Sequence, residues 1–216
     1  MNHFLPGRIL DFGCGTGYFL KRLATRFSAD GFEISKQGAG YAKELNPNAT
    51  IYSNFEEIPR DCYYGITALH VFEHITDTDL IHVLKTLRQI LIPGGRLLCV
   101  VPELGGRGHL LKQEQWAGFM DPTHINLKTR AEWLNLLSNN GYELIAYGTD
   151  GLWDFPYLHG RSRFIDVCRF APATVIQFLS GRLLLPPGSG ESLIMIFESK
   201  SDMTESAPER FLPLTS

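Results

Sequence analysis

The sequence lacks several features, and each absence removes a class of protein. Its four cysteines (Cys14, Cys62, Cys99 and Cys168) form no C-x-x-C pair, which argues against a disulfide framework or a zinc ribbon and favours a reducing cytoplasm. The net charge of −3 gives no sign of a nucleic-acid partner. No apolar run approaches the ~20 residues of a membrane span, and no secretory signal or internal repeat is visible. We therefore expect a cytoplasmic protein with no nucleic-acid partner and no membrane span.

What the sequence does have is a glycine-rich turn between an apolar strand and an amphipathic helix. Residues 8–12 predict a short buried strand, and the apolar spacing of residues 18–27 predicts a helix. Gly13, Gly15 and Gly17 lie between them. Glycine permits unusual φ angles and close approach to the backbone, and the helix start behind the turn offers free N–H groups. The pattern favours a ligand with nucleotide character, and a tight turn without a ligand is the alternative.

An acidic residue follows the glycines at a distance typical of nucleotide-binding folds. A second predicted strand, residues 30–34, carries Glu33 near its end. In the dinucleotide fingerprint an acid about 20 residues beyond the glycines binds ribose hydroxyls. The glycine spacing here is G-x-G-x-G, so the third glycine comes one residue earlier than in that fingerprint. We interpret Glu33 as a ribose ligand, and a merely solvated strand-end acid is the alternative.

Beyond this unit, strands and helices continue to alternate. Alternation of this kind predicts an α/β fold with a mainly parallel sheet flanked by helices. In the first part of the chain we predict strands at 8–12, 30–34, 50–53 and 65–70, and helices at 18–27, 35–45 and 79–91. In the second part we predict strands at 96–101, 142–147 and 193–198, and a helix opened by a Thr129–Glu132 capping box and stopped at Gly141. "IPGG" is predicted to form a sharp turn between helix and strand.

Five motifs in order carry a family resemblance that covers about residues 7–149. They are ILDFGCGTGYFLKRL, GFEIS, NFEEIP, ITALHVFEHI and ILIPGGRLLCVVP. In this order they resemble the motifs of class I S-adenosylmethionine-dependent methyltransferases, and most of all the small-molecule group that includes ubiquinone-type O-methyltransferases. The resemblance implies a doubly wound, mostly parallel seven-stranded sheet of the Rossmann-like methyltransferase fold. It implies that the last strand runs antiparallel beside the fifth, with S-adenosylmethionine bound at the carboxyl ends of the strands and S-adenosylhomocysteine as product.

The resemblance also assigns cofactor-binding positions. At Asn54 the family commonly has an acid that binds the adenine amino group; this chain has an amide, whose carbonyl oxygen still accepts a hydrogen bond. Phe55 would then pack on the adenine ring, although a loop asparagine beside a core phenylalanine would look the same. The implied cofactor-binding set is Asp11, Gly13, Cys14, Gly15, Gly17, Glu33, Ile34, Asn54, Phe55, Leu69, His70 and Val71.

Two histidines are candidates for catalysis. His70 to His74 matches the H-x-x-E-H pattern of metalloproteases, but His70 ends an apolar strand, so we expect no metal. His74 is a plausible general base because imidazole titrates near neutrality. The alternative is that Glu73 and His74 only order the loop. The resemblance places His124 at the active-site mouth, with Asp121 close enough in sequence to orient it. A structural Asp–His pair is the alternative.

We expect a single methyltransferase domain over residues 1–200, with insertions at about 103–128 and 150–190 and a flexible tail at 201–216. Long segments outside the strand–helix rhythm are usually functional. These insertions carry aromatic residues that the core of the fold does not need, so we interpret them as a substrate lid. The predicted acceptor-site residues are Trp116, Trp153 and Tyr157.

We therefore predict an enzyme that transfers a methyl group from S-adenosylmethionine to a small molecule, at oxygen. An NAD(P)-dependent oxidoreductase would share the glycine turn and the acid, but its glycine spacing differs. A non-catalytic methyltransferase-like subunit is the stronger alternative. Relatives of this kind have helices before the first strand that cap the cofactor, whereas here the first strand begins within a handful of residues. We expect the insertions, a partner subunit or a second copy to supply that cover, unless the start is truncated.

Overall fold

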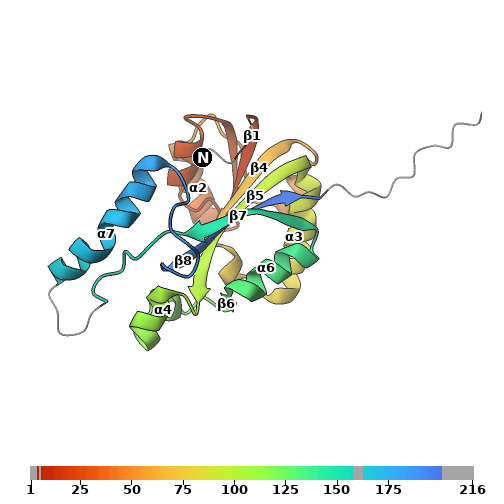
Figure 1. Cartoon of the computed structure of the whole chain (residues 1–216). Helices are drawn as coiled ribbons and strands as arrows, with labels where there is room; N and C mark the ends of the chain where they lie inside the picture. Colours follow the sequence, from red (N-terminus) through yellow and green to blue (C-terminus); the bar gives the residue numbers. More distant parts are fainter. Residues whose placement is uncertain (1–3, 5, 158–162, 201–216) are drawn as a thin grey trace, which may run out of the picture.

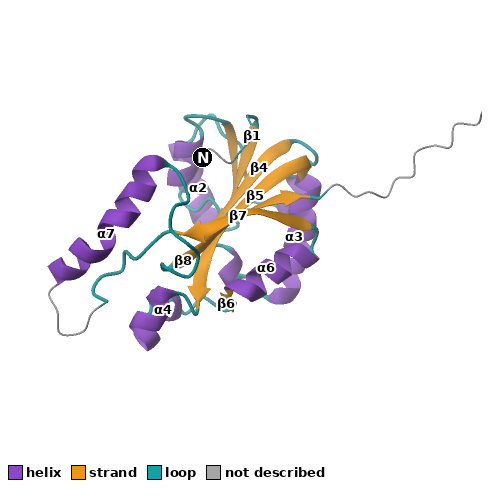
Figure 2. Ribbon diagram, in the orientation of Figure 1, coloured by secondary structure: helices purple, strands orange, loops and turns teal. Residues whose placement is uncertain are grey.

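The structure is a computed structural model that describes residues 4, 6–157 and 163–200, so the predicted tail at 201–216 lies outside the described residues. Its centre is one twisted sheet with helices on both sides (Figure 1, Figure 2). The strands are β1 (Arg8–Phe12), β2 (Ser28–Phe32), β3 (Ile51–Tyr52), β4 (Tyr63–Leu69), β5 (Leu91–Leu104), β6 (Lys128–Thr129), β7 (Tyr142–Thr149) and β8 (Ser192–Ser199). The α-helices are α1 (Tyr18–Leu23), α2 (Lys36–Leu45), α3 (Asp77–Ile90), α4 (Arg107–Lys112), α5 (Ala117–Met120), α6 (Arg130–Asn139) and α7 (Arg163–Ser180). Three 3₁₀ turns are η1 (Phe55–Glu57), η2 (Phe72–His74) and η3 (Gln113–Gln115).

Seven strands follow the order β3-β2-β1-β4-β5-β8-β7. The first five are parallel, and β8 runs antiparallel between β5 and β7. This order confirms the doubly wound, mostly parallel seven-stranded sheet and the antiparallel last strand beside the fifth. The short β6, which the sequence analysis did not predict, pairs with the end of β5.

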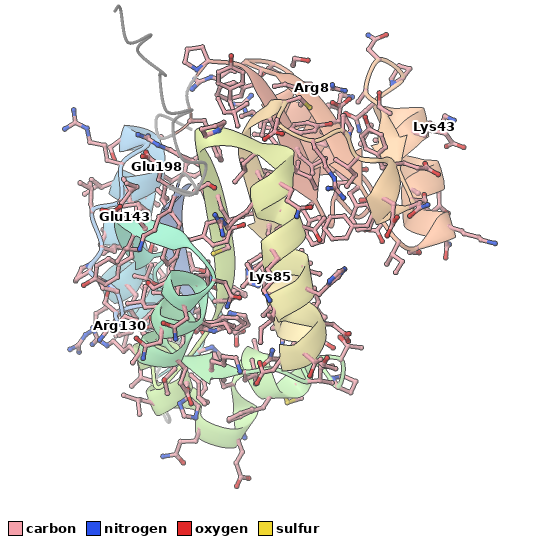
Figure 3. The ribbon with its side chains drawn as sticks, turned by 90° about the vertical axis from the view of Figure 1, so that its right-hand side faces the viewer. Arg8, Lys43, Lys85, Arg130, Glu143 and Glu198 are labelled. Atoms are coloured by element: carbon pink, nitrogen blue, oxygen red, sulfur yellow. The ribbon has the colours of Figure 1, made fainter. Side chains whose placement is uncertain are left out.

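The polarity of the sheet is visible in Figure 3. Arg8 begins β1 and Glu198 lies near the end of antiparallel β8, and both are at the upper end of the molecule in this view. Arg130, which begins α6 just after β6, lies toward the lower end. The carboxyl ends of the parallel strands therefore point to the lower end, where ligands bind in open α/β sheets.

Side chains alternate across the sheet and feed two cores. On β1, Ile9 packs with Leu20, Leu23 and other residues of α1 and α2 on one face. Leu10, its neighbour, belongs to the larger core on the other face. Helices α3 and α6 cover that larger core with Leu80, Leu84, Leu87, Trp133 and Leu137. A sheet covered on both faces explains the near-continuous apolar strands in the sequence.

Of two local predictions, one is confirmed and one is corrected. The capping box is present, because the Thr129 side chain accepts from the Glu132 N–H and Glu132 accepts from the Thr129 N–H. The prediction that "IPGG" lies between helix and strand is wrong. Strand β5 already begins at Leu91, opposite Tyr63, and the next pair joins Gly65 to Arg96, so the four residues bulge out of β5. The bulge absorbs the left-handed φ of 74° at Gly94 without ending the pairing.

The two insertions differ in form. Residues 103–128 hold α4, η3 and α5 around the end of β5, and residues 150–190 hold α7. In Figure 1, α7 stands apart from the sheet at the left of the view. Among the described residues, no helix combines the length and the apolar character needed to cross a membrane.

Candidate active site

The glycine turn is fixed to the end of β2 by its backbone. The N–H groups of Gly13 and Cys14 both donate to the carbonyl oxygen of Phe32, each at 2.9 Å. Gly15 has a φ of 52°, and a Cβ built there would meet no atom within 4 Å. A Cβ on Gly13 would instead lie 2.5 Å from the Val71 side chain. Gly13 therefore allows the β1 and β4 loops to meet, and Gly15 leaves open space beside the turn.

Glu33 is the first residue after β2 and ties the glycine turn to the start of α2. Its Oε2 accepts from the Gly15 N–H at 2.8 Å, and its Oε1 accepts from the Ser35 N–H at 2.8 Å. A carboxylate has about four acceptor sites, so these two bonds orient Glu33 and leave capacity for hydroxyl donors. The sequence analysis placed Glu33 within the strand, but the strand ends one residue earlier, at Phe32.

A cavity of about 570 Å³ opens beside this turn. Its walls come from the carboxyl ends of β1, β2 and β4 and from the loops that follow them. Its lining residues are Phe12, Gly13, Phe32, Glu33, Ile34, Phe55, His70, Val71, His74, Ile75 and Val83. The structure thus brings together six of the twelve predicted cofactor positions. A second cavity of about 590 Å³ includes Asp61 and Leu91, at the amino ends of β4 and β5, and has no glycine turn.

Three phenylalanines form an apolar wall of the first cavity. The Phe12 and Phe32 rings stack with centroids 4.9 Å apart. The Phe55 ring lies 5.3 Å from Phe12 and 5.4 Å from Phe32. Such a wall suits a flat aromatic ligand. The sequence analysis identified Phe55 but missed Phe12 and Phe32, although each is the last apolar residue of a strand that ends at the turn.

His70 leads from β4 into the active-site loop with a strained backbone, at a φ of 54°. Its Nδ1 lies 3.0 Å from Oε1 of Glu73, whose side chain is fully buried. Burial opposes protonation of His70, but the Glu73 carboxylate outweighs it and raises the pKa of the imidazole. Oε2 of Glu73 is buried and has no hydrogen-bond partner among the described residues.

His74 and His124 meet at the rim, with ring centroids 4.8 Å apart. His74 Nδ1 lies 3.1 Å from the Thr123 carbonyl oxygen, and His124 Nδ1 lies 2.8 Å from the Gly118 carbonyl oxygen. A carbonyl oxygen only accepts, so each Nδ1 carries a proton, and in the neutral ring each Nε2 is then the basic nitrogen. Asp121 lies 3.8 Å from His124 Nε2 and accepts from the Thr123 hydroxyl at 2.6 Å.

Three side chains at this rim could hold a metal ion. One potential ligand atom each from Glu73, His74 and His124 lie within 4.8 Å of one another. The second histidine of this group is His124, whereas the H-x-x-E-H pattern would have used His70. His70 instead pairs with Glu73. The expected absence of a metal stays a prediction.

The remaining predicted cofactor positions lie around the cavity without lining it. Asp11 is buried in β1, where it accepts from the Thr67 hydroxyl at 2.7 Å, and burial raises its pKa to about 6. Cys14 and Gly17 close the turn, because the Gly17 N–H donates to the Cys14 carbonyl oxygen at 2.9 Å. A Cβ on Gly17 would lie 2.5 Å from the Asn46 side chain. Asn54 caps η1 by accepting from the Glu56 N–H. Leu69 is the last residue of β4.

The predicted acceptor residues lie in a separate network within the insertions. Trp116 is buried and donates from Nε1 to Oε2 of Glu191 at 2.7 Å. The Tyr157 hydroxyl donates to Oε1 of the same carboxylate. Trp153 is half exposed and donates to Asp150 at 2.7 Å. These three residues are not among those that line the cavity. Sequence reasoning missed Glu191, which lies in a short polar stretch with no motif of its own.

The fold is Rossmann-like, and the cavity beside its glycine turn is large enough to hold a nucleotide-type cofactor. A family model described as a methyltransferase domain matches residues 2–147 of this chain. The chain therefore belongs to the methyltransferase domain family, and it is a class I S-adenosylmethionine-dependent methyltransferase. This family rules out the NAD(P)-dependent oxidoreductase that the glycine turn alone left open.

Solved structures share the fold at low sequence identity. A methyltransferase from Archaeoglobus fulgidus, described as S-adenosylmethionine-dependent, is 16% identical with a TM-score of 0.59, covering 91% of this chain and 88% of its own. A complex of the Haloferax volcanii Trm112 methyltransferase activator with a putative methyltransferase is 16% identical with a TM-score of 0.65, covering 93% of this chain and 86% of its own. The plantazolicin methyltransferase BamL, in complex with a desmethyl analogue and S-adenosylhomocysteine, is 21% identical with a TM-score of 0.60, covering 90% of this chain and 77% of its own. No curated protein matches this chain by sequence.

The cofactor is thus S-adenosylmethionine, and the chain's own residues fit it. Open space lies next to the backbone at Gly15, Glu33 has unused acceptor capacity, and Phe55 closes an apolar wall. Such features suit a ligand that carries a ribose and an aromatic base.

Proposed function

We propose that the protein methylates a small molecule at oxygen, as in the ubiquinone-type group that its motifs resemble. The observation that carries the proposal is the histidine pair at the rim of the cavity, with both Nδ1 atoms engaged by carbonyl oxygens. Such a pair offers basic nitrogens where an acceptor would enter. A hydroxyl nucleophile gains from a base, whereas an electron-rich carbon has less need of one.

In this proposal the cofactor occupies the cavity beside the glycine turn. Glu33 accepts hydrogen bonds from the ribose hydroxyls, while Phe55 and Asn54 contact the adenine. Leu69, His70 and Val71 lie against the methionine part, largely through backbone atoms. When bound, S-adenosylmethionine supplies a methyl group already activated on a sulfonium. The protein's task is then to align the acceptor and exclude water.

His74 or His124 takes the acceptor proton at Nε2. Thr123 and Asp121 support this role, because the threonine contacts His74 and the aspartate contacts both Thr123 and His124. Hydrogen bonds from Thr123 lower the pKa of Asp121 and so keep a negative charge beside the imidazoles. A negative charge at that distance stabilises an imidazolium once the proton has been transferred.

The two insertions, in this proposal, cover the acceptor. Trp116 supports the rim, because its ring packs against Gly118, whose carbonyl oxygen holds His124. Trp153 and Tyr157 would complete the lid from the second insertion. A partner subunit or a second copy is a further candidate for this cover, since one fold neighbour was solved with a Trm112 activator. The four free thiols support a reducing compartment such as the cytoplasm.

The test is a methyl-transfer assay with a panel of hydroxylated small molecules, measuring S-adenosylhomocysteine formation. Substitution of the histidine that acts as the base, by His74→Asn or by His124→Asn, should lower turnover by about 10²- to 10⁴-fold near neutral pH. The loss should shrink as the pH rises, because the acceptor hydroxyl then ionises unaided. His82→Asn, on the exposed side of α3, is the matched control and should retain full turnover. Equal turnover in all variants would contradict a histidine base.

The absence of a metal is tested in the same assay. Treatment with a chelator should leave turnover unchanged, because the proposed mechanism needs only the imidazoles. A loss that added Zn²⁺ restores would instead show that Glu73, His74 and His124 act as metal ligands. That result would contradict the proposal that a histidine acts as the base.

A further inference from the structure

Helix α7 turns its polar side chains inward. Asp166, Phe170, Thr174 and Gln177 recur at helical spacing and are buried or half-buried. The Asp166 carboxylate accepts from the Tyr157 N–H at 2.6 Å. The Gln177 side chain donates to the Thr149 carbonyl oxygen at 2.6 Å and accepts from two backbone N–H groups of the following turn. Hydrogen bonds thus attach the helix to the domain near both of its ends, and the Phe170 ring contacts Tyr157 between them.

The opposite side of α7 is apolar and exposed. Phe164, Val175 and Leu179 share one face by their spacing of 11 and 4 residues, and their side chains are 73%, 50% and 77% exposed. Phe178 flanks this face at 83% exposure, and Ile176 at 59%. We call these five residues the α7 apolar face. A helix on a water-exposed surface normally has the reverse arrangement, with apolar residues inward. An exposed apolar patch of this kind marks an interaction site.

The exposed charged residues on α7, on the turn after it and against Phe170 are arginines. Arg107, Arg169 and Arg182 are exposed. The first two hold their guanidinium groups 5.2 and 5.6 Å from the Phe170 ring. Asp166 is the sole acidic residue between positions 163 and 190 of the sequence, and it is buried. This basic surface belongs to a chain whose net charge is −3.

We propose that α7 lies in the headgroup region of an anionic lipid bilayer. An amphipathic helix with large apolar residues on one face and arginines beside it binds in the plane of such a surface. The apolar face would enter the acyl boundary, and the arginines would meet the negative surface potential. A second copy fits less well, because a symmetric α7–α7 interface would bring the arginines of both copies together with no exposed acid from this segment to pair them.

Vesicle flotation of the full chain tests the proposal. The protein should float with phosphatidylcholine vesicles that contain about a third phosphatidylglycerol, and much less with phosphatidylcholine alone. Raising the salt from about 0.1 M to 0.5 M should weaken the binding, since it screens the arginines. The measurement needs no cofactor and no acceptor. It therefore succeeds or fails independently of the proposed methyl transfer.

Variants locate the binding surface. Phe178→Ser with Leu179→Ser should lower vesicle partition at least about tenfold, because two of the most exposed apolar side chains are removed. Ile145→Ser with Tyr147→Ser is the matched control on β7, where these side chains are 45% and 43% exposed. The control should float like the wild type. Arg169→Gln with Arg182→Gln should remove most of the preference for anionic vesicles.

Two results would overturn the proposal. One is a folded wild-type protein that fails to float with anionic vesicles at low salt. The other is a dimer in sedimentation velocity that Phe178→Ser with Leu179→Ser dissociates, in a protein that does not bind vesicles. The second result would assign the α7 apolar face to another copy of this chain.

Discussion

The glycine-turn region and the two insertions use acidic side chains in different ways. Around the turn, Glu33 bonds to backbone N–H groups of Gly15 and Ser35 and borders a cavity. In the insertions, Glu191 bonds to the side chains of Trp116 and Tyr157 and lies in the interior. Neither aromatic residue lines the cavity next to the turn. In the first arrangement the carboxylate borders a cavity, whereas in the second its acceptor oxygens are bonded to donors within the protein.

This difference predicts that a substitution near the turn changes ligand affinity, whereas a substitution in the insertions changes stability. A carboxylate that borders a cavity contributes to the ligand's affinity, and its loss costs the fold little. A buried carboxylate shared by two donors stabilises the fold, and its loss leaves those donors unpaired. The substitutions below test the contrast from the largest expected effect to the smallest.

Gly15→Val should abolish S-adenosylhomocysteine binding, weakening it at least about 100-fold, because the new side chain enters the space beside the turn. Calorimetry measures the affinity, and circular dichroism checks that the chain is folded. Gly94→Val is the control: Gly94 also has a positive φ, 74°, with no atom within 4 Å of a Cβ, but lies in the β5 bulge. Normal binding by Gly15→Val would show that the ligand does not approach this backbone.

Glu191→Ala should lower the free energy of unfolding by about 3–5 kcal/mol, since it leaves the Trp116 and Tyr157 donors buried and unpaired. Urea denaturation measures the effect. Glu198→Ala, on the more exposed surface of β8, should cost far less. Affinity for S-adenosylhomocysteine should stay within about twofold of the wild type in both variants. A large loss of affinity in Glu191→Ala would show that the insertions also determine cofactor binding, and would contradict the contrast between the two regions.

Asp11→Asn should stabilise the protein at neutral pH. Burial raises the pKa of Asp11 from 3.8 to about 6, so the folded state favours the neutral acid. The contribution of Asp11 to the free energy of unfolding is therefore greatest below pH 4, and it is lost as the pH rises to 6 and above. The variant, always neutral, should gain roughly 3 kcal/mol over the wild type at pH 7.5 and almost nothing at pH 4. Urea denaturation at both pH values measures the gain, and a variant less stable than the wild type at pH 7.5 contradicts the account.

Glu33→Ala should weaken S-adenosylhomocysteine binding by about 1–3 kcal/mol, because the ribose hydroxyls lose their acceptor. Calorimetry on this variant is compared with Glu44→Ala, which removes an exposed acid from the same helix region, at α2. An affinity equal to that of the wild type would refute ribose recognition by Glu33. The thermal stability of both variants should remain close to that of the wild type.

The turn region could be predicted from sequence because its requirements are local. Glycine spacing and apolar runs reflect backbone geometry, so the sequence located the turn at Gly13 to Gly17 and placed Glu33 at the end of the second strand, within one residue of where β2 ends. The Thr129 capping box could also be predicted, because its two residues are three positions apart in the sequence. The insertions could not be placed in this way, because Trp116 meets Glu191 across 75 residues of sequence. No local pattern records such a contact, nor the meeting of His74 with Thr123 and His124.

The most direct test of the central claim is calorimetric titration of the wild-type chain with S-adenosylhomocysteine, with NADH as the comparison. We predict one site per chain for S-adenosylhomocysteine and no heat from NADH, because the turn, Glu33 and the phenylalanine wall form one cofactor cavity. Absence of heat at millimolar S-adenosylhomocysteine, with a folded protein, would contradict the claim.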